Sequence, residues 1–284
     1  MSFTALGLLV GAAILHAAWN LLLKQTNEKY VVTWWALLVG SLCFLPLMFT
    51  GQMLPLHVLP LAALSAFFEA AYFVSLAAAY RDADFSLIYP IARGTAPALL
   101  AMWSILFLGE RLSYGGILGL TIIVCGLVTI SSSAIFKRHA ATPNLRSVIL
   151  AFLVALFISA YSVVDGGAVR LTSPIKYMVV VFGLTMLFIT PFMFKFYGWQ
   201  KLKKGWEANW LRASSIGFLI LASYGLVLIA FTIAPVSYSG AVRESSIVVG
   251  ALAGCLFLGE GFGRTRVLAS VVIFAGILVI ALAG

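Results

Sequence analysis

The sequence predicts an all-α integral membrane protein with ten transmembrane helices, arranged as two inverted repeats of five helices (5+5). The prediction rests on an apolar composition, on long stretches without charge and on an internal repeat. Of the 284 residues, 63% are hydrophobic and 10% are charged, whereas soluble domains are about 45 to 50% apolar and about a quarter charged. Because this number of charged residues is too small to cover a water-facing surface, a soluble globular enzyme is excluded.

The charge-free stretches identify the membrane-spanning segments. No Asp, Glu, Lys or Arg occurs in six stretches: 31–68, 112–136, 147–164, 177–194, 213–242 and 267–284. About 20 apolar residues cross roughly 30 Å of hydrocarbon as a helix, so each stretch is long enough for a span. The runs are continuously apolar and do not alternate every second residue, which favours helices over a membrane barrel.

Ten helices fit this pattern in chain order. The first five are expected over 3–23, 31–50, 58–79, 84–108 and 112–132. The second five are expected over 146–167, 175–196, 210–232, 236–258 and 264–282. The first run has no basic residues before it, so it is a membrane helix rather than a secretory signal peptide.

An offset of 150 residues reveals the repeat. Residues 81–130 align with 231–280 without a gap, and 11 positions are identical, including Arg93 with Arg243, LFLGE at 106–110 with LFLGE at 256–260, and Gly126 with Gly276. Because five helices are an odd number, the second copy enters the membrane from the opposite side. Inverted repeats of this kind build secondary transporters, whose substrate site lies between the halves near the midplane.

The LFLGE pair, the duplication and the length resemble the EamA-type permeases of the drug/metabolite transporter (DMT) superfamily, over the whole chain. The strings HAAWN (16–20), FEAAYF (68–73), YPIARG (89–94) and VRESS (242–246) resemble a subgroup of permeases, some of which occur with phosphonate-utilisation genes. The resemblance implies one EamA-like repeat over 1–133, a cytoplasmic linker over 134–145 and a second repeat over 146–284. It also implies transport of a metabolite across the plasma membrane, the inner membrane in bacteria.

Loop charge predicts the orientation. Thirteen of the 18 Lys and Arg residues fall in loops on one face and three on the other. Positive loops stay in the cytoplasm, so both termini are expected outside. The longest basic loop, 197–210, interleaves Lys with Trp, which favours a segment at the lipid headgroups over a nucleic-acid site.

Ionisable groups inside spans are candidates for function because they are costly in hydrocarbon. The repeat mates Arg93 and Arg243 are expected to bind a carboxylate, phosphate or phosphonate of the substrate. The alternative is that each arginine only pairs with Glu69 or Glu244. Glu69, at the centre of its helix, is a candidate for proton coupling or charge pairing, and we place Asp165 and Glu244 in the same group.

Aromatic and polar residues complete the predicted substrate site. His16, Trp19 and Asn20 share one helix face because they stand at i, i+3 and i+4. In the resembled family, the helices that carry tyrosines here line the cavity, so the following are further candidates: Tyr72, Tyr89, Tyr161, Tyr224 and Tyr238. Aromatic walls with few polar groups suit an amphipathic small molecule, although tyrosine is also an ordinary interior residue of helix bundles.

A third group is assigned to structure. Glu110 and Glu260 precede the last helix of each repeat, where an acid meets the positive end of a helix dipole. Pro90, Gly94 and Pro97 predict a bend in the fourth helix, a candidate gating hinge. Gly115, Gly116, Gly119 and Gly126 indicate close helix packing.

We therefore expect a secondary active transporter of a small amphipathic metabolite, amino-acid-like and bearing a carboxylate or phosphonate, working by alternating access. Proton coupling remains open. The main alternative is an exporter of drugs or hydrophobic cations; a membrane-embedded enzyme is disfavoured because no nucleophile–base cluster occurs. No metal and no cofactor are expected. The expected partners are the substrate and the lipid bilayer, with no nucleic acid, and the protein is expected to be a monomer or a homodimer.

Overall fold

The computed structural model describes the chain except at residues 52, 83–84, 138–144 and 250–263. Side chains are also outside the description at 77–82, 85–91, 93, 130–137, 145–148 and 264–266. The first repeat contains α1 (Phe3–Lys24), α2 (Lys29–Phe44), α3 (Leu59–Asp82), α4 (Phe85–Leu108) and α5 (Tyr114–Lys137). Two short 3-10 helices, η1 (Leu45–Phe49) and η2 (Leu56–Val58), lie between α2 and α3. These five helices occupy the five predicted spans.

The second repeat contains α6 (Leu145–Ala168), α7 (Pro174–Ile233), α8 (Val236–Arg243) and α10 (Arg264–Ala283). The count of ten is not confirmed, because the described residues form nine α-helices. Two reasons account for the difference. The predicted span 236–258 is described only as far as residue 249, and the spans 175–196 and 210–232 lie within the continuous helical run of α7.

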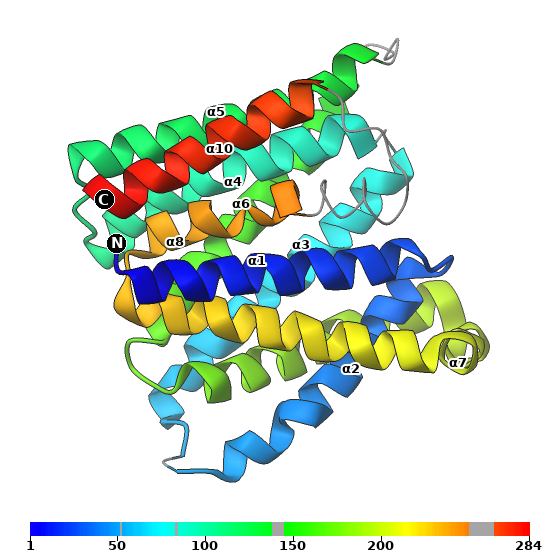
Figure 1. Cartoon of the computed structure of the whole chain (residues 1–284). Helices are drawn as coiled ribbons and strands as arrows, with labels where there is room; N and C mark the ends of the chain where they lie inside the picture. The colour runs from blue at the N-terminus through cyan, green and yellow to red at the C-terminus, as the bar shows by residue number, and fades with distance from the viewer. Residues whose placement is uncertain (52, 83–84, 138–144, 250–263) are drawn as a thin grey trace.

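The run of α7 changes direction where its backbone leaves helical geometry. Gly198 (φ 68°, ψ 159°) and Asn209 (φ −136°, ψ 17°) interrupt the helix, and Figure 1 shows the chain folding back there. The segment between these residues, expected as a loop, is helical because it is rich in the good helix formers Lys, Leu, Glu and Ala. Trp35 of α2 holds this segment, since its indole donates to the Leu202 carbonyl (2.8 Å) and its ring lies 4.9 Å from that of Trp206.

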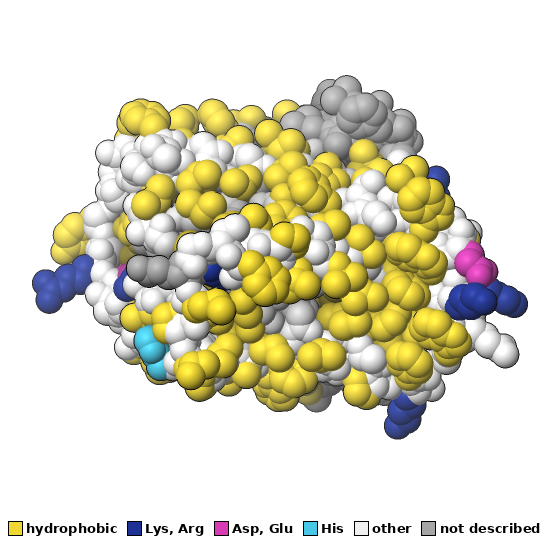
Figure 2. Space-filling model, turned by 90° about the horizontal axis from the view of Figure 1, so that it is seen from below, with side chains coloured by type: hydrophobic (Ala, Val, Ile, Leu, Met, Phe, Trp, Pro, Cys, Tyr) yellow, Lys and Arg dark blue, Asp and Glu magenta, His cyan; other side chains and the backbone are white. Residues whose placement is uncertain are grey.

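The surface is that of a multi-pass membrane protein. Five helices of the described part are long and apolar enough to cross a membrane, and three shorter ones are apolar. Large hydrophobic side chains, such as Phe188, Phe218 and Phe274, are exposed. Figure 2 shows hydrophobic side chains over the middle of one face and most of the visible Lys and Arg toward its two ends.

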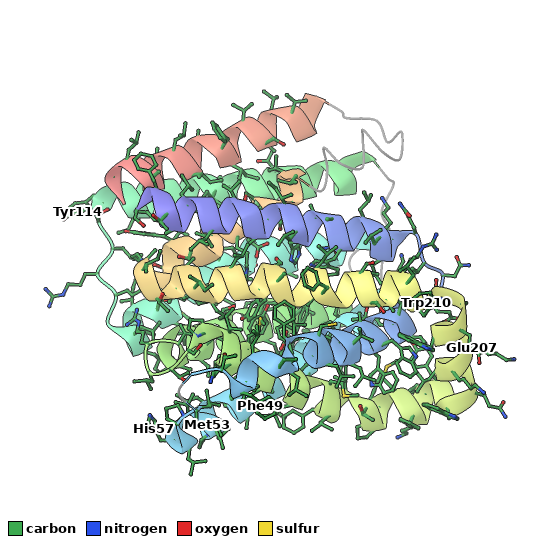
Figure 3. All side chains as sticks on the ribbon, turned by 60° about the horizontal axis from the view of Figure 1, so that its bottom comes forward. Phe49, Met53, His57, Tyr114, Glu207 and Trp210 are labelled. Carbon is green, nitrogen blue, oxygen red and sulfur yellow. The ribbon has the colours of Figure 1, made fainter. Side chains whose placement is uncertain are left out.

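The loops sort to two ends of the helices. The Met1 amino group donates to the Gly284 carbonyl (3.2 Å) and the Ser113 hydroxyl donates to the Ala283 carbonyl (2.6 Å), so both termini meet at one end. Figure 3 shows Tyr114 and His57 at this end and Glu207 and Trp210 at the other. Successive loops therefore alternate between the two ends, as the assignment of Lys and Arg to two faces assumes.

Helices α5 and α10 pack side by side through glycines (Figure 1). A Cβ added to Gly126 would lie 2.6 Å from Ile273 Cγ1, and one added to Gly276 would lie 2.7 Å from Ile123 Cγ1. Gly276 is the repeat mate of Gly126, and Ile123 is the repeat mate of Ile273, so the two contacts are equivalent under the offset of 150 residues. A two-fold relation between the halves produces this reciprocity, and the predicted close-packing role of Gly126 is confirmed.

Candidate functional site

A cluster of buried polar side chains lies among α3, α6, α7 and α8. It includes Glu69 of α3, Asp165 of α6, Arg243 at the end of α8 and Glu244, the residue that caps that helix. Asp165 has no exposed surface and Glu69 is 6% exposed. Buried charge is costly unless it is hydrogen-bonded or paired, so the contacts of each group determine what the cluster can do.

Asp165 accepts hydrogen bonds from two tyrosines of α7. The Tyr177 hydroxyl donates to Oδ1 (2.8 Å) and the Tyr224 hydroxyl donates to Oδ2. Tyr177 starts the first leg of α7 and Tyr224 lies in the second, so the fold-back of α7 brings both hydroxyls to one carboxyl. Tyr224 and Asp165 were predicted site residues. Tyr177 was not, because a neutral side chain at the start of an apolar helix carries no signal in the sequence.

Glu69 is held by α7 in a similar way. The Thr185 hydroxyl donates to Glu69 Oε2 (2.9 Å), and it also lies 3.5 Å from the Ala66 carbonyl. The carboxyls of Glu69 and Asp165 are close enough to interact electrostatically, and the charge of Arg243 acts on both. Three residues far apart in sequence therefore share one electrostatic environment.

Arg243 forms an ion pair with Glu244, with 3.6 Å between Nη2 and Oε1. Both side chains are buried. Of the two acids that sequence analysis offered as partners, the structure places Glu244 in contact with Arg243.

Three of the predicted tyrosines form a row of rings beside this cluster. The ring centroids of Tyr72 and Tyr161 are 6.3 Å apart, those of Tyr161 and Tyr224 are 6.2 Å apart, and Phe182 follows at 5.5 Å from Tyr224. The three tyrosines come from α3, α6 and α7, and the last of them, Tyr224, donates a hydrogen bond to Asp165.

Other predicted residues lie elsewhere. The Tyr238 hydroxyl accepts the Ser113 backbone N–H (3.0 Å) at the end that carries the termini, so Tyr238 joins α8 to the start of α5. On α1, the His16 and Trp19 rings meet edge to face at 4.8 Å, and the Asn20 amide donates to the His16 carbonyl (2.8 Å).

Glu110 has a structural role, but at a different helix from the one expected. It receives the backbone N–H of Val236 at Oε1 (2.6 Å), and the N–H (3.2 Å) and hydroxyl (2.6 Å) of Ser237 at Oε2. Arg170 lies 3.4 Å from Oε1. Glu110 therefore caps α8 of the second half and not α5, which follows it in the chain. The free N–H groups at a helix start attract a carboxylate.

Four predicted side chains, those of Arg93, Tyr89, Pro90 and Glu260, lie outside the described residues. The backbone of α4 runs as one helix from Phe85 to Leu108, through the predicted hinge. Gly94 packs against α5, since a Cβ there would lie 3.0 Å from Val128 Cγ2. Within the described part of the chain, no group of three or more His, Cys, Asp and Glu side chains is placed to hold a metal ion.

A multi-pass helical membrane protein with related halves and a buried polar cluster is the architecture of a transporter. The EamA-like transporter family matches this chain twice, over residues 3–132 and 145–282, and the chain belongs to that family. It is therefore a transporter and not an enzyme.

The fold is similar to that of a protein solved by crystallography, with a TM-score of 0.80 at 18% sequence identity over 99% of this chain and 98% of the other. Among curated proteins, none matches the chain significantly in sequence.

Proposed function

We propose that this protein is a secondary active transporter that moves a small amphipathic, amino-acid-like metabolite with a carboxylate or phosphonate across the plasma membrane. The observation that carries the proposal is the buried cluster of Arg243, Glu69 and Asp165 beside the row of tyrosine rings. A rigid guanidinium matches an anionic head group, and aromatic rings accommodate an apolar part.

The two halves support alternating access around this cluster. Its groups come from α3 in the first repeat and from α6, α7 and the end of α8 in the second, so relative movement of the halves opens or closes it. We assign the repeats to 1–133 and 146–284, with 134–145 as a cytoplasmic linker. Arg93 of the first half is proposed to take the anion at the other stage of the cycle, as the repeat mate of Arg243. His16, Trp19 and Asn20 are proposed to line the same path.

Proton coupling is assigned to the carboxyl of Glu69. Its carboxyl accepts a hydrogen bond from the neutral hydroxyl of Thr185, and this bond can persist whether the carboxyl is protonated or ionised. The side that faces the cytoplasm follows from loop charge, and we place both termini outside.

The test is ligand-induced thermal stabilisation of the detergent-purified protein. The probes are amino acids, organic acids, phosphonates and hydrophobic cations, each tested on wild type and on Arg243→Gln. A ligand at about 100 times its Kd adds roughly 2.7 kcal/mol to the free energy of unfolding. We expect one anion-bearing class to raise the Tm of wild type and to lose this effect in the variant.

Stabilisation by hydrophobic cations alone, equal in both proteins, would overturn the proposal. It would favour an exporter of drugs or hydrophobic cations, the second candidate function. The buried Asp165 carboxyl and the tyrosine row beside it are the observations that favour that candidate.

A further inference from the structure

A pocket that shares no residue with the buried cluster lies beside the connection between α2 and α3. Its volume is about 380 Å³, within the range of about 300 to 1,000 Å³ that is typical of pockets for small molecules. Both halves of the chain line it. The first half contributes the connection before α3, and the second half contributes the turn before α7 and the first residues of that helix.

The wall from the second half carries a cation and two hydroxyls. Lys176 is the one charged residue among those that line the pocket, and it is only 5% exposed. Its ammonium donates to the Met48 carbonyl (3.1 Å) and has a further interaction within the chain, so its position at the wall is fixed. Thr172 and Ser173 line the same wall, and the Ser173 side chain makes no capping hydrogen bond to α7.

Large apolar side chains are exposed on the wall from the first half and next to it. Met53 lines the pocket, and Met53, Phe49 and Leu56 are among the most exposed hydrophobic side chains of the described residues. Figure 3 shows Phe49 and Met53 on the α2–α3 connection, toward the end that carries Tyr114. Near the ends of membrane-spanning helices the hydrocarbon gives way to the lipid headgroups. The pocket therefore combines a cationic wall with an apolar edge at the depth where both parts of a lipid are present.

The phosphate of a lipid headgroup fits this combination. An ammonium is a compact charge with three N–H donors and binds phosphate oxygens, and the two hydroxyls can donate to further oxygens. The acyl chains of the same molecule can cover the exposed apolar side chains, which removes apolar surface from water. A free anion would use only the cationic wall, so the apolar edge favours a lipid.

We propose that this pocket binds the headgroup phosphate of an anionic phospholipid, held by Lys176, Thr172 and Ser173. The acyl chains of the lipid lie against Phe49, Met53 and Leu56. Because the walls come from both halves of the chain, the bound lipid contacts both halves at the end that carries the termini. This site is distinct from the proposed substrate site.

The experiment measures lipid binding to the full-length protein in detergent by native mass spectrometry, which counts the lipids retained on each protein, and by the shift in Tm. The probes are phosphatidylglycerol and phosphatidylcholine with identical acyl chains, and inorganic phosphate as the free anion. The main variant is Lys176→Gln. Lys203→Gln is the control, since Lys203 lies near Glu207 at the opposite end and its side chain is exposed.

A second pair of variants leaves the buried lysine in place, because Lys176→Gln can impair folding. Thr172→Glu and Thr172→Gln introduce side chains of nearly equal size, and only the first adds a negative charge to the pocket wall. A difference in lipid binding between these two variants therefore reports the charge of the ligand.

We expect phosphatidylglycerol to occupy one saturable site on wild type and to bind more tightly than phosphatidylcholine. Lys176→Gln should raise the apparent Kd of phosphatidylglycerol at least about tenfold, as loss of a charge-assisted hydrogen bond does. Thr172→Glu should raise it severalfold above the value for Thr172→Gln, because the added carboxylate repels the phosphate. Lys203→Gln should bind like wild type.

Equal binding of phosphatidylglycerol by wild type and Lys176→Gln would overturn the proposal, as would equal binding by the two Thr172 variants. If inorganic phosphate stabilises wild type as well as phosphatidylglycerol does, and Lys176→Gln abolishes both effects, the pocket is a site for free anions and the assignment to a lipid is wrong.

Discussion

At the scale of single residues, Glu110 shows how one side chain joins the two halves. Its side chain is 6% exposed, and its carboxyl receives three hydrogen bonds from the first two residues of α8. The acid of one repeat thus caps the start of a helix in the other, a role that the local sequence around Glu110 could not reveal, because the partner lies 126 positions away. Sequence position suggested only that some helix start was nearby.

Removal of this carboxyl should therefore destabilise the protein. We expect Glu110→Ala to lower the free energy of unfolding by about 1 to 3 kcal/mol, because buried N–H donors lose a charged acceptor. The loss is measured as a lower Tm in detergent, with Glu207→Ala as the control at an acid that is 58% exposed. Equal Tm values for the two variants would show that the cap contributes nothing.

The residues of the candidate site also fall into those that the sequence could predict and those that it could not. Asp165, Glu69, Arg243 and three tyrosines could be predicted, because charge and aromatic rings stand out in an apolar helix. Tyr177 and Thr185 could not be predicted, since neutral polar residues are common in spans and only the tertiary fold gives these two their acid partners.

At the scale of elements, α7 shows the limit of hydropathy. The two spans inside it were predicted within a few residues, because each is apolar over its length. The connecting helix was not predicted, since charge identifies a segment outside the bilayer but not its backbone conformation. Its direction is set by Gly198, where φ is +68°.

Two glycines of α7 provide a matched test of this break. Both have open space where a Cβ would stand, but Gly198 has positive φ and Gly183 does not. We expect Gly198→Ala to lower the free energy of unfolding by about 1 kcal/mol through backbone strain. Gly183→Ala should raise it by a similar amount, because alanine favours the helix by about 1 kcal/mol. The measurement is the Tm of each variant in detergent. Equal Tm shifts in the two variants would contradict a turn that is fixed by the positive φ of Gly198.

At the scale of the whole molecule, the repeat determines both topology and charge distribution. The contacts of Met1 with Gly284 and of Ser113 with Ala283 place the termini and the loop before α5 at one end. The repeat could be read from sequence because Arg, Gly and Glu recur in register at an offset of 150. Which side of the membrane this end faces rests on loop charge alone.

Cysteine labelling tests the orientation. In a background without Cys43, Cys125 and Cys255, a membrane-impermeant maleimide should label Tyr114→Cys in intact cells, because Tyr114 is 96% exposed at the termini end. Lys203→Cys, at the other end, should react only after the membrane is opened. The reverse pattern would place the termini in the cytoplasm and show that the basic loops lie outside.

The most direct test of the account is solute counterflow in proteoliposomes loaded with an unlabelled amino acid that stabilises the wild type. A carrier that alternates between two sides exchanges its substrate, so labelled amino acid outside should accumulate transiently within the vesicles. We expect this overshoot with wild type and with Glu207→Gln, and its loss with Arg243→Gln. Entry without an overshoot, or an overshoot that persists in Arg243→Gln, would contradict a transporter that works through this buried cluster.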